Sequence, residues 1–169
     1  IVFVVNTANP IEDVSLIQVR QAFQGRITNW QSLGGDRIAM QVVSRESGSG
    51  IRSEFEQAVM GRRVTTGAAL TASSSLGVLR TVATHPGALG YVSLAILDAT
   101  VRPLAVDGVA PTLETLRDHT YPLRSTVFVV GKDEPQGGAR GFIGWMQSQE
   151  GQTVLSRLYL PLVATPGGD

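Results

Sequence analysis

Apolar and polar residues follow two alternating periods along this chain, one typical of strands and one typical of helices. Short apolar or alternating runs between turn residues predict strands at 1–5, 37–43, 65–71, 88–92, 101–106 and 126–130. Between these runs, apolar residues recur three or four positions apart, which predicts helices that begin near Ser15, Ile51, Ser75, Thr112 and Ala139. Because strands and helices alternate along the whole chain, we expect an α/β fold.

Turn residues and aromatic side chains refine this outline. Gly25 is expected to end the first helix and Gly61 the second, since glycine tolerates the left-handed backbone that follows many helices. Within the polar loop at 25–35, Trp30 and Leu33 are expected to pack on the core and to hold their polar neighbours in place.

The most informative polar stretch is residues 44–52, Ser-Arg-Glu-Ser-Gly-Ser-Gly-Ile-Arg, which connects a predicted strand to a predicted helix. The first N–H groups of a helix lack intrahelical partners and carry a partial positive charge, so they attract anions. Arg45 adds a planar guanidinium that can pair with two oxygens, while Ser47 and Ser49 add hydroxyl donors. The two glycines of the stretch lack a Cβ and let a ligand approach the backbone. The stretch therefore predicts an oxyanion site.

Other roles stay open for the same residues. Ser49 could serve only as the N-cap of the helix, and Arg52 could form an ion pair with Glu56 one turn further on. A cation in the first helical turn opposes the helix dipole, so Arg52 otherwise indicates a nearby anion. A serine hydrolase that uses Ser47 or Ser49 is a weaker hypothesis, because Ser47 stands where the nucleophile elbow needs glycine.

Composition narrows the classes of function. The 14 basic residues balance the 14 acidic ones, so no overall field favours nucleic acid or an anionic membrane, and an anion site must be local. The chain has no cysteine, and its two histidines, His85 and His119, stand alone. We therefore expect no metal, no other cofactor and no nucleic-acid partner. No apolar run approaches the roughly 20 residues that span a bilayer. The abrupt apolar start at 1–5 suggests a fragment or a processed chain.

Several stretches, read together and in this order, resemble the periplasmic phosphate-binding proteins of phosphate ABC transporters. They are QAFQGRITNWQSLGG at 21–35, SRESGSGIRSEF at 44–55, HPGALGYVS at 85–93 and FIGWMQSQEGQ at 142–152. The resemblance spans nearly all of the 169 residues. It rests on the combination of these stretches, because no single one of them is specific.

The resemblance implies a periplasmic-binding-protein-like fold of type II, in which two lobes joined by crossing strands close on the ligand. Residues 6–124 would form a complete second lobe, with a mixed sheet flanked by helices and the anion-binding loop. Residues 1–5 and 125–169 would be the crossing strands and the helices of an incomplete first lobe. In the family, the rest of that lobe lies upstream and supplies further ligands, among them an aspartate. Without the aspartate, phosphate and sulfate stay open as ligands.

The loop chemistry and this resemblance together predict the oxyanion ligands and no catalytic residue. The ligands are Arg45, Ser47, Ser49, Gly50 and Ile51. Ile51 stands where the family has threonine, so its N–H remains but a hydroxyl donor is lost. The implied function is a periplasmic or extracellular substrate-binding domain for inorganic phosphate in an ABC-type uptake system. The alternative is an interaction or sensory module that keeps the fold but has lost tight binding.

The implied partners are phosphate or a similar oxyanion, an ABC transporter permease, and either the missing N-terminal lobe or a second copy. The second copy would form a homodimer or exchange elements with the first. This last expectation follows from an apolar helix face that would be left exposed without its lobe. Its residues are Ala139, Phe142, Ile143 and Met146.

Overall fold

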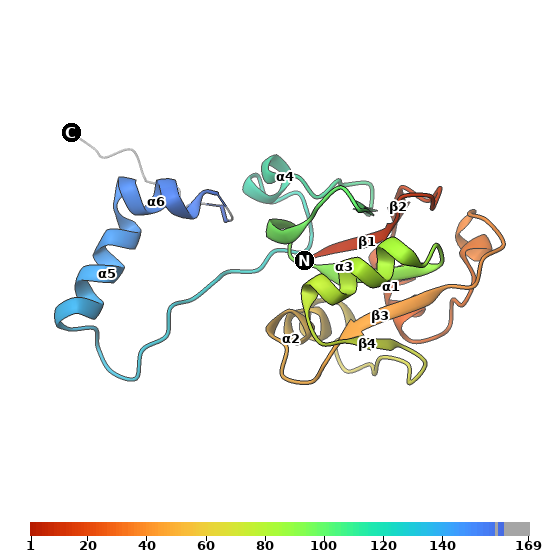
Figure 1. Cartoon of the computed structure of the whole chain (residues 1–169), viewed down its shortest axis with the longest axis horizontal. Helices are drawn as coiled ribbons and strands as arrows, with labels where there is room; N and C mark the ends of the chain where they lie inside the picture. Colours follow the sequence, from red (N-terminus) through yellow and green to blue (C-terminus); the bar gives the residue numbers. More distant parts are fainter. Residues whose placement is uncertain (158, 161–169) are drawn as a thin grey trace. The chain divides into compact units, whose positions relative to one another are not determined.

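The computed structural model describes residues 1–157, 159 and 160, and the chain divides into two compact units, Ile1–Ser125 and Thr126–Asp169 (Figure 1). The first unit holds a five-stranded sheet in the order β4-β3-β5-β1-β6. Its strands are β1 (Val2–Asn6), β3 (Gln41–Arg45), β4 (Leu70–Ala72), β5 (Ala88–Val92) and β6 (Val101–Pro103). β3 runs parallel to β4 and β5, whereas β1 runs antiparallel to β5 and β6. The expected α/β class with a mixed sheet is confirmed.

A second, two-stranded parallel sheet joins β2 (Asp13–Val14) to β7 (Ala105–Val106). The strand predicted at 101–106 is therefore two strands, because its first half pairs with β1 and its second half with β2. The strand predicted at 37–43 is shifted toward the C-terminus, since regular pairing of β3 begins only at Gln41 and continues through Arg45. Arg45 is thus the last residue of a strand.

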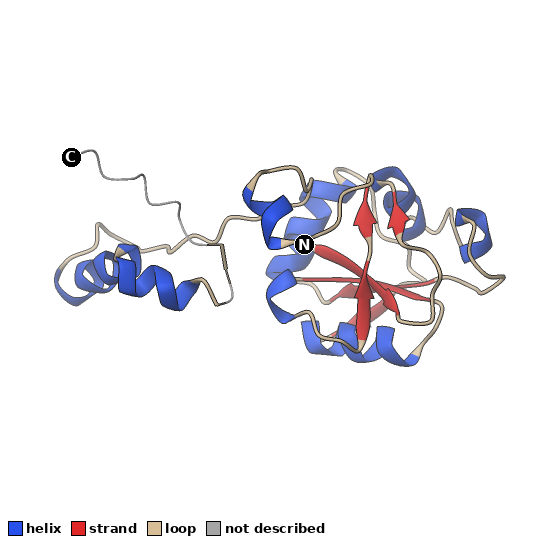
Figure 2. Cartoon of the chain, turned by 90° about the horizontal axis from the view of Figure 1, so that it is seen from above, coloured by secondary structure: helices blue, strands red, loops and turns tan. Residues whose placement is uncertain are grey.

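Helices cover both faces of the large sheet (Figure 2). β1 is buried along its whole length, and its side chains alternate between two cores, with Phe3 on one face and Val4 on the other. Helices α1 (Leu16–Phe23) and α2 (Gly50–Phe55) contribute side chains to the first core, and α3 (Ser75–Thr84) contributes to the second. Burying a side chain of this kind stabilises a fold by roughly 1.5–3 kcal/mol. The two cores therefore hold α2 and α3 against opposite faces of the sheet.

Local sequence explains where the helices begin and end. Ser15 caps α1 in a reciprocal capping box with Gln18, and Gly25 follows the helix with a φ of +75°. α2 continues as a π-helical turn, η2 (Glu56–Met60), which ends at Gly61. The predicted helix ends at both glycines are confirmed. The short helix α4 (Leu113–Arg117) has a capping box of its own, and a 3₁₀ turn, η3 (Leu94–Ile96), follows β5.

Trp30 holds the loop at 25–35 on the core, as predicted. It opens a 3₁₀ turn, η1 (Trp30–Leu33), is only 1% exposed, and its indole Nε1 donates to the carbonyl oxygen of Gly87 at 2.9 Å. Glycine is required at position 87, because a Cβ there would lie 2.1 Å from the carbonyl oxygen of Ala39. Leu33 packs against the same core from a partly buried position.

The second unit contains two helices, α5 (Gly137–Gln147) and α6 (Gln149–Leu155), among its described residues. The strand predicted at 126–130 is wrong: this segment forms no strand in the described chain, and Val127–Val130 are 63% to 88% exposed. An apolar run becomes a strand only when another strand pairs with it. Of the predicted apolar helix face, Phe142 is exposed and stacks on Trp145, with ring centroids 6.0 Å apart.

The resemblance predicts a crossing strand between two lobes at 1–5 and a lobe boundary near residue 125. β1, expected at 1–5 as a crossing strand, makes its hydrogen bonds with β5 and β6 inside the first unit. The boundary near residue 125 coincides with the boundary between the units. Among the described residues, no helix has both the length and the apolar character needed to cross a bilayer.

Candidate functional site

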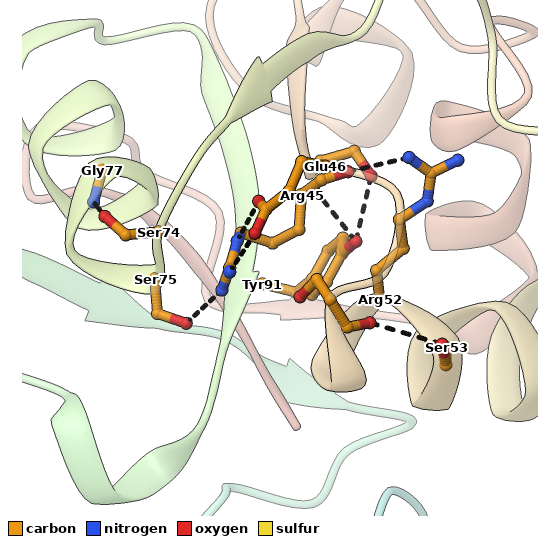
Figure 3. A network of polar contacts seen from close by, with 10 residues as sticks. Arg45, Glu46, Arg52, Ser53, Ser74, Ser75, Gly77 and Tyr91 are labelled. Atoms are coloured by element: carbon orange, nitrogen blue, oxygen red, sulfur yellow. Dashed lines mark hydrogen bonds and ion pairs between the residues drawn. The ribbon is translucent and has the colours of Figure 1, made fainter.

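Two strand-to-helix connections lie at one edge of the large sheet (Figure 3). β3 ends at Arg45, and residues 46–49 lead into α2; β4 ends at Ala72, and residues 73–74 lead into α3. Arg45 pairs with Ala72 in the parallel register of β3 and β4, so both helices begin at the same edge. Ligands of open α/β sheets bind at this position, outside the carboxyl ends of the strands.

Arg45 is the central cation of this edge. Its side chain is 12% exposed, and its Nη1 donates to Ser75 Oγ at 2.6 Å. Its Nε and Nη2 donate to the two carboxylate oxygens of Glu46, each at 2.8 Å. The hydrogen bond from Arg45 lowers the pKa of Glu46 to about 2, so this carboxylate is charged at neutral pH. Glu46 therefore occupies the bidentate edge of the guanidinium, the edge that best fits an oxyanion.

Arg52 has the structural role that the sequence left open for it. Its Nε forms an ion pair with Glu56 at 2.8 Å, one helical turn further on, and its Nη1 donates to the carbonyl oxygen of Arg45 at 2.9 Å. Arg52 thus satisfies the last carbonyl of β3. The hydrogen bond with Glu56 raises the pKa of this already basic guanidinium, which stays charged at any physiological pH.

Ser49 stands at the N-cap of α2 but does not cap it with its side chain. The residue is buried, and its Oγ makes no capping hydrogen bond within the described chain. Its backbone carbonyl accepts from the N–H of Ser53 at 3.0 Å and from Ser53 Oγ at 3.3 Å. The hydroxyl of Ser49 is therefore not used as a cap, and the alternative of a simple side-chain N-cap is not what the structure has.

The other predicted ligands lie around this serine. Ser47 is exposed, and Gly48 between the two serines has a φ of +86°, which favours glycine. Gly50 opens α2, and beyond its chain neighbours and the backbone of its own helix no described atom lies within 4 Å of the place where its Cβ would be. Ile51 is half-buried and packs against the first core. The N–H of Ser53 donates to the carbonyl oxygen of Ser49. The N–H groups of Gly50 and Ile51 come before it, in the first turn of α2, where helical N–H groups have no intrahelical acceptor.

These groups can bind an anion but are not arranged for acid–base catalysis. Arg45, the Ser49 hydroxyl and the first N–H groups of α2 are all hydrogen-bond donors at one edge of the sheet. His85 lies at the other end of α3, where its Nδ1 contacts the carbonyl oxygen of Thr81 and Thr84 Oγ1. Among the described residues, no group of His, Cys, Asp and Glu side chains could hold a metal ion.

Comparison with known families agrees with this architecture. Residues 1–150 match the family model described as the PBP superfamily domain. The chain belongs to the PBP superfamily. Among curated proteins, it is 32% identical over 162 residues to the phosphate-binding protein PstS of Bacillus subtilis, an alignment that covers 94% of this chain and 53% of that protein. It is 33% identical over 125 residues to phosphate-binding protein PstS 2 of Streptococcus pneumoniae, an alignment that covers 69% of this chain and 43% of that protein. The chain thus spans about half the length of the curated relatives it matches.

Solved structures of similar proteins extend the match to three dimensions. A phosphate ABC transporter substrate-binding protein from Clostridium perfringens, solved with bound phosphate, aligns with a TM-score of 0.87 at 30% identity. That alignment covers 96% of this chain and 68% of the other. An ABC-type phosphate transport receptor from Vibrio cholerae aligns with a TM-score of 0.80 at 26% identity, over 95% and 68% of the two chains.

In this PBP superfamily domain, three residues make contacts with Arg45 that the sequence did not predict. Glu46 pairs with Arg45, Ser75 accepts from it, and the hydroxyl of Tyr91 accepts the backbone N–H of Arg45 at 3.3 Å (Figure 3). The available signals were a serine at the start of a predicted helix and a tyrosine inside an apolar strand, whose buried hydroxyl needs a polar partner. Neither signal identifies which distant residue is the partner.

Proposed function

We propose that this chain is the anion-binding part of an extracytoplasmic substrate-binding protein for inorganic phosphate in an ABC-type uptake system. One observation carries the proposal: Arg45 ends β3 next to the open start of α2, where the Ser49 hydroxyl makes no capping bond within the described chain. The proposal is supported by the names of the relatives, which include phosphate-binding proteins and a transporter protein solved with phosphate.

The proposed ligand contacts are those that the loop offers. Arg45 donates from its guanidinium, Ser47 and Ser49 from their hydroxyls, and Gly50 and Ile51 from their backbone N–H groups. A hydrogen bond to a charged group contributes about 1.5–3 kcal/mol. Because Glu46 now accepts from two nitrogens of Arg45, phosphate has to displace this carboxylate or bind beside it. No catalytic step is part of the proposal.

The proposal also includes macromolecular partners. The bound phosphate would pass to an ABC transporter permease outside the cytoplasm. A second lobe, either the N-terminal lobe that the resemblance implies or a second copy of the chain, would close over the open edge of the sheet. The exposed apolar segment Val127–Val130 and the exposed ring of Phe142 are the surfaces that such a lobe or copy would cover.

A second candidate function is an interaction or sensory module that has lost tight phosphate binding. Two observations favour it. Glu46 already occupies the bidentate edge of the Arg45 guanidinium, and Ile51 offers no hydroxyl where the resembled family has a threonine. A module of this kind would keep the fold and its partners while its loop binds phosphate weakly or not at all.

Calorimetric titration of the full chain with phosphate and with sulfate tests the proposal. We expect phosphate binding in the wild type and a loss of at least about tenfold in affinity for Arg45→Ala, because a charge-assisted hydrogen bond is removed. Arg80→Ala is the matched control: Arg80 is exposed on α3 and the change removes the same formal charge. Equal affinities for the two variants would contradict the proposed site, and no heat with either anion in the wild type would favour the second candidate.

A further inference from the structure

Tyr91 connects the strand that precedes the oxyanion loop to the rest of the sheet. It lies in β5, is fully buried, and its hydroxyl is 2.9 Å from Ser44 Oγ and 3.3 Å from the backbone N of Arg45 (Figure 3). The Arg45 N–H can only donate, so the tyrosine oxygen accepts from it, whereas in the contact with Ser44 either hydroxyl can donate. Burial raises the pKa of Tyr91, which keeps this hydroxyl protonated and able to make both bonds.

The ring of Tyr91 contacts the helix that follows the loop. It stacks on Phe55 of α2, with ring centroids 4.2 Å apart and an angle of 12° between the planes. Phe23 of α1 packs against both rings, 4.6 Å from Phe55 and 5.7 Å from Tyr91. Close aromatic pairs of this kind add stabilisation beyond the area that they bury. The hydroxyl thus fixes the segment before the loop at 46–49, and the ring fixes the segment after it.

We propose that Tyr91 is a positioning residue for the oxyanion loop, one that sets the distance between Arg45 and the start of α2. This inference rests on the proposed function, because the loop is the proposed phosphate site. Tyr91 would not touch the ligand. It would act by holding the backbone of Arg45 in place, so that the guanidinium meets Ser75 and the ligand without a search for the right geometry. A binding site gains affinity when its donors are ordered before the ligand arrives.

Tyr121 provides a matched control for this proposal. It is also a fully buried tyrosine of the first unit, and it belongs to the same core as Tyr91. Its hydroxyl, however, has no hydrogen-bond partner among the described residues. Tyr91→Phe and Tyr121→Phe therefore delete the same atom from the same core, but only the first removes an acceptor of the part-buried N–H of Arg45, directly before the loop.

The test measures phosphate affinity and amide hydrogen exchange of the full chain in both variants. For Tyr91→Phe we expect phosphate affinity to fall roughly tenfold, since the backbone of Arg45 loses the one hydrogen bond that ties it to Tyr91. The amide of Arg45 and those of the loop should exchange faster, while the amides of β1 should keep their wild-type protection. Tyr121→Phe should change neither quantity. Faster exchange confined to the loop is a result that a general loss of packing would not produce, because β1 amides report the opening of the whole core.

Each outcome decides one of the two proposals. If the wild type binds no phosphate, the proposed function fails, and the exchange rates of the loop still decide the role of Tyr91. If Tyr91→Phe matches Tyr121→Phe in loop exchange, Tyr91 is not a positioning residue. Should Tyr91→Phe fail to fold, Ser44→Ala removes the other partner of the hydroxyl, and the same rise in loop exchange over that of Tyr121→Phe is expected. Its absence would overturn the proposal.

Discussion

The two helices that begin at the site differ in how their first turns are satisfied. At the start of α3, Ser74 Oγ accepts from the N–H of Gly77 at 3.0 Å, which is an ordinary side-chain N-cap. At the start of α2, Ser49 holds the same position but its Oγ makes no capping bond within the described chain. The two N-caps are the same residue type in the same kind of connection, so sequence alone does not distinguish them.

The difference is consistent with the proposed anion site, in which one helix start is complete within the protein and the other keeps free donors. The cap of α3 is complete within the protein, and Ser75 beside it accepts from Arg45. The start of α2 still has donors to offer, from the Ser49 hydroxyl and from the first N–H groups of the helix. A helix start that is left uncapped costs stability. We infer that α3 fixes the geometry of Arg45 while α2 keeps its donors for the ligand.

The largest expected effect comes from replacing each of the two N-cap serines, Ser49 and Ser74, by alanine in a separate variant. Ser49→Ala should weaken phosphate binding by about 1.5–3 kcal/mol, the value of a hydrogen bond to a charged group, and should change stability by less than about 0.5 kcal/mol. Ser74→Ala should do the reverse: it removes a cap worth about 1 kcal/mol of stability and no proposed ligand contact. Calorimetry and chemical denaturation of both variants check this. A loss of stability in Ser49→Ala equal to that in Ser74→Ala would remove the contrast between the two helix starts.

A smaller effect is expected when α3 is moved away from the sheet. Gly90 lies in β5 beneath α3, and a Cβ there would be 2.6 Å from Val78 Cγ1 and 3.1 Å from Val82 Cγ2. Gly90→Ala should therefore cost about 1–2 kcal/mol of unfolding free energy through overpacking. It should also weaken phosphate binding, because the contact between Arg45 and α3 is displaced.

Gly67→Ala is the control for this change. Apart from its chain neighbours, no described residue has an atom within 4 Å of the place where a Cβ of Gly67 would be, so the substitution should leave stability and binding close to those of the wild type. Unfolding by denaturant measures the first quantity and calorimetry the second. If Gly90→Ala lowered stability but left phosphate affinity unchanged, the position of α3 would not matter for Arg45.

Much of the fold could be predicted because its signals are local. Ser15 and Gly25 mark the two ends of α1 within a few residues of the helix that they bound, and β1 was recognisable from its uninterrupted apolar run. The same apolar signal failed at 126–130, since a strand also needs a pairing partner, and no strand of the described chain pairs with that segment. Local pattern indicates what a segment is able to form, whereas pairing decides whether it does so.

The site followed the same division. The candidate oxyanion loop was predicted from residues that are neighbours in sequence, and helical spacing had offered the ion pair of Arg52 with Glu56 as one alternative. Ser75 and Tyr91 contact Arg45 but lie 30 and 46 positions after it in the sequence, so only the order of the strands in the sheet brings them together. Side chains of successive residues within a strand point to opposite faces of the sheet and do not meet. Arg45 can pair with its neighbour Glu46 because β3 ends at Arg45 and Glu46 already belongs to the loop.

The smallest expected effect is a dependence of the stability of the fold on pH, which arises from the ion pair of Glu46 with Arg45. The folded pKa of Glu46 is about 2, below its ordinary value of 4.5. A carboxyl whose pKa is lowered on folding stabilises the protein above its unfolded pKa, and this contribution is lost as the pH falls from about 4.5 to about 2. The midpoint temperature of thermal unfolding should therefore fall more steeply across this pH window for the wild type than for Glu46→Gln, because the glutamine side chain has no proton to gain.

A second measurement uses Arg45→Ala. In this variant the pKa of Glu46, followed by the NMR resonance of its carboxyl group, should lie closer to 4.5, because the hydrogen bond that lowers this pKa is absent. Parallel curves of unfolding temperature against pH for the wild type and Glu46→Gln would mean that the carboxylate does not pair with Arg45 in solution, which would leave the Nε and Nη2 of the guanidinium available to a ligand.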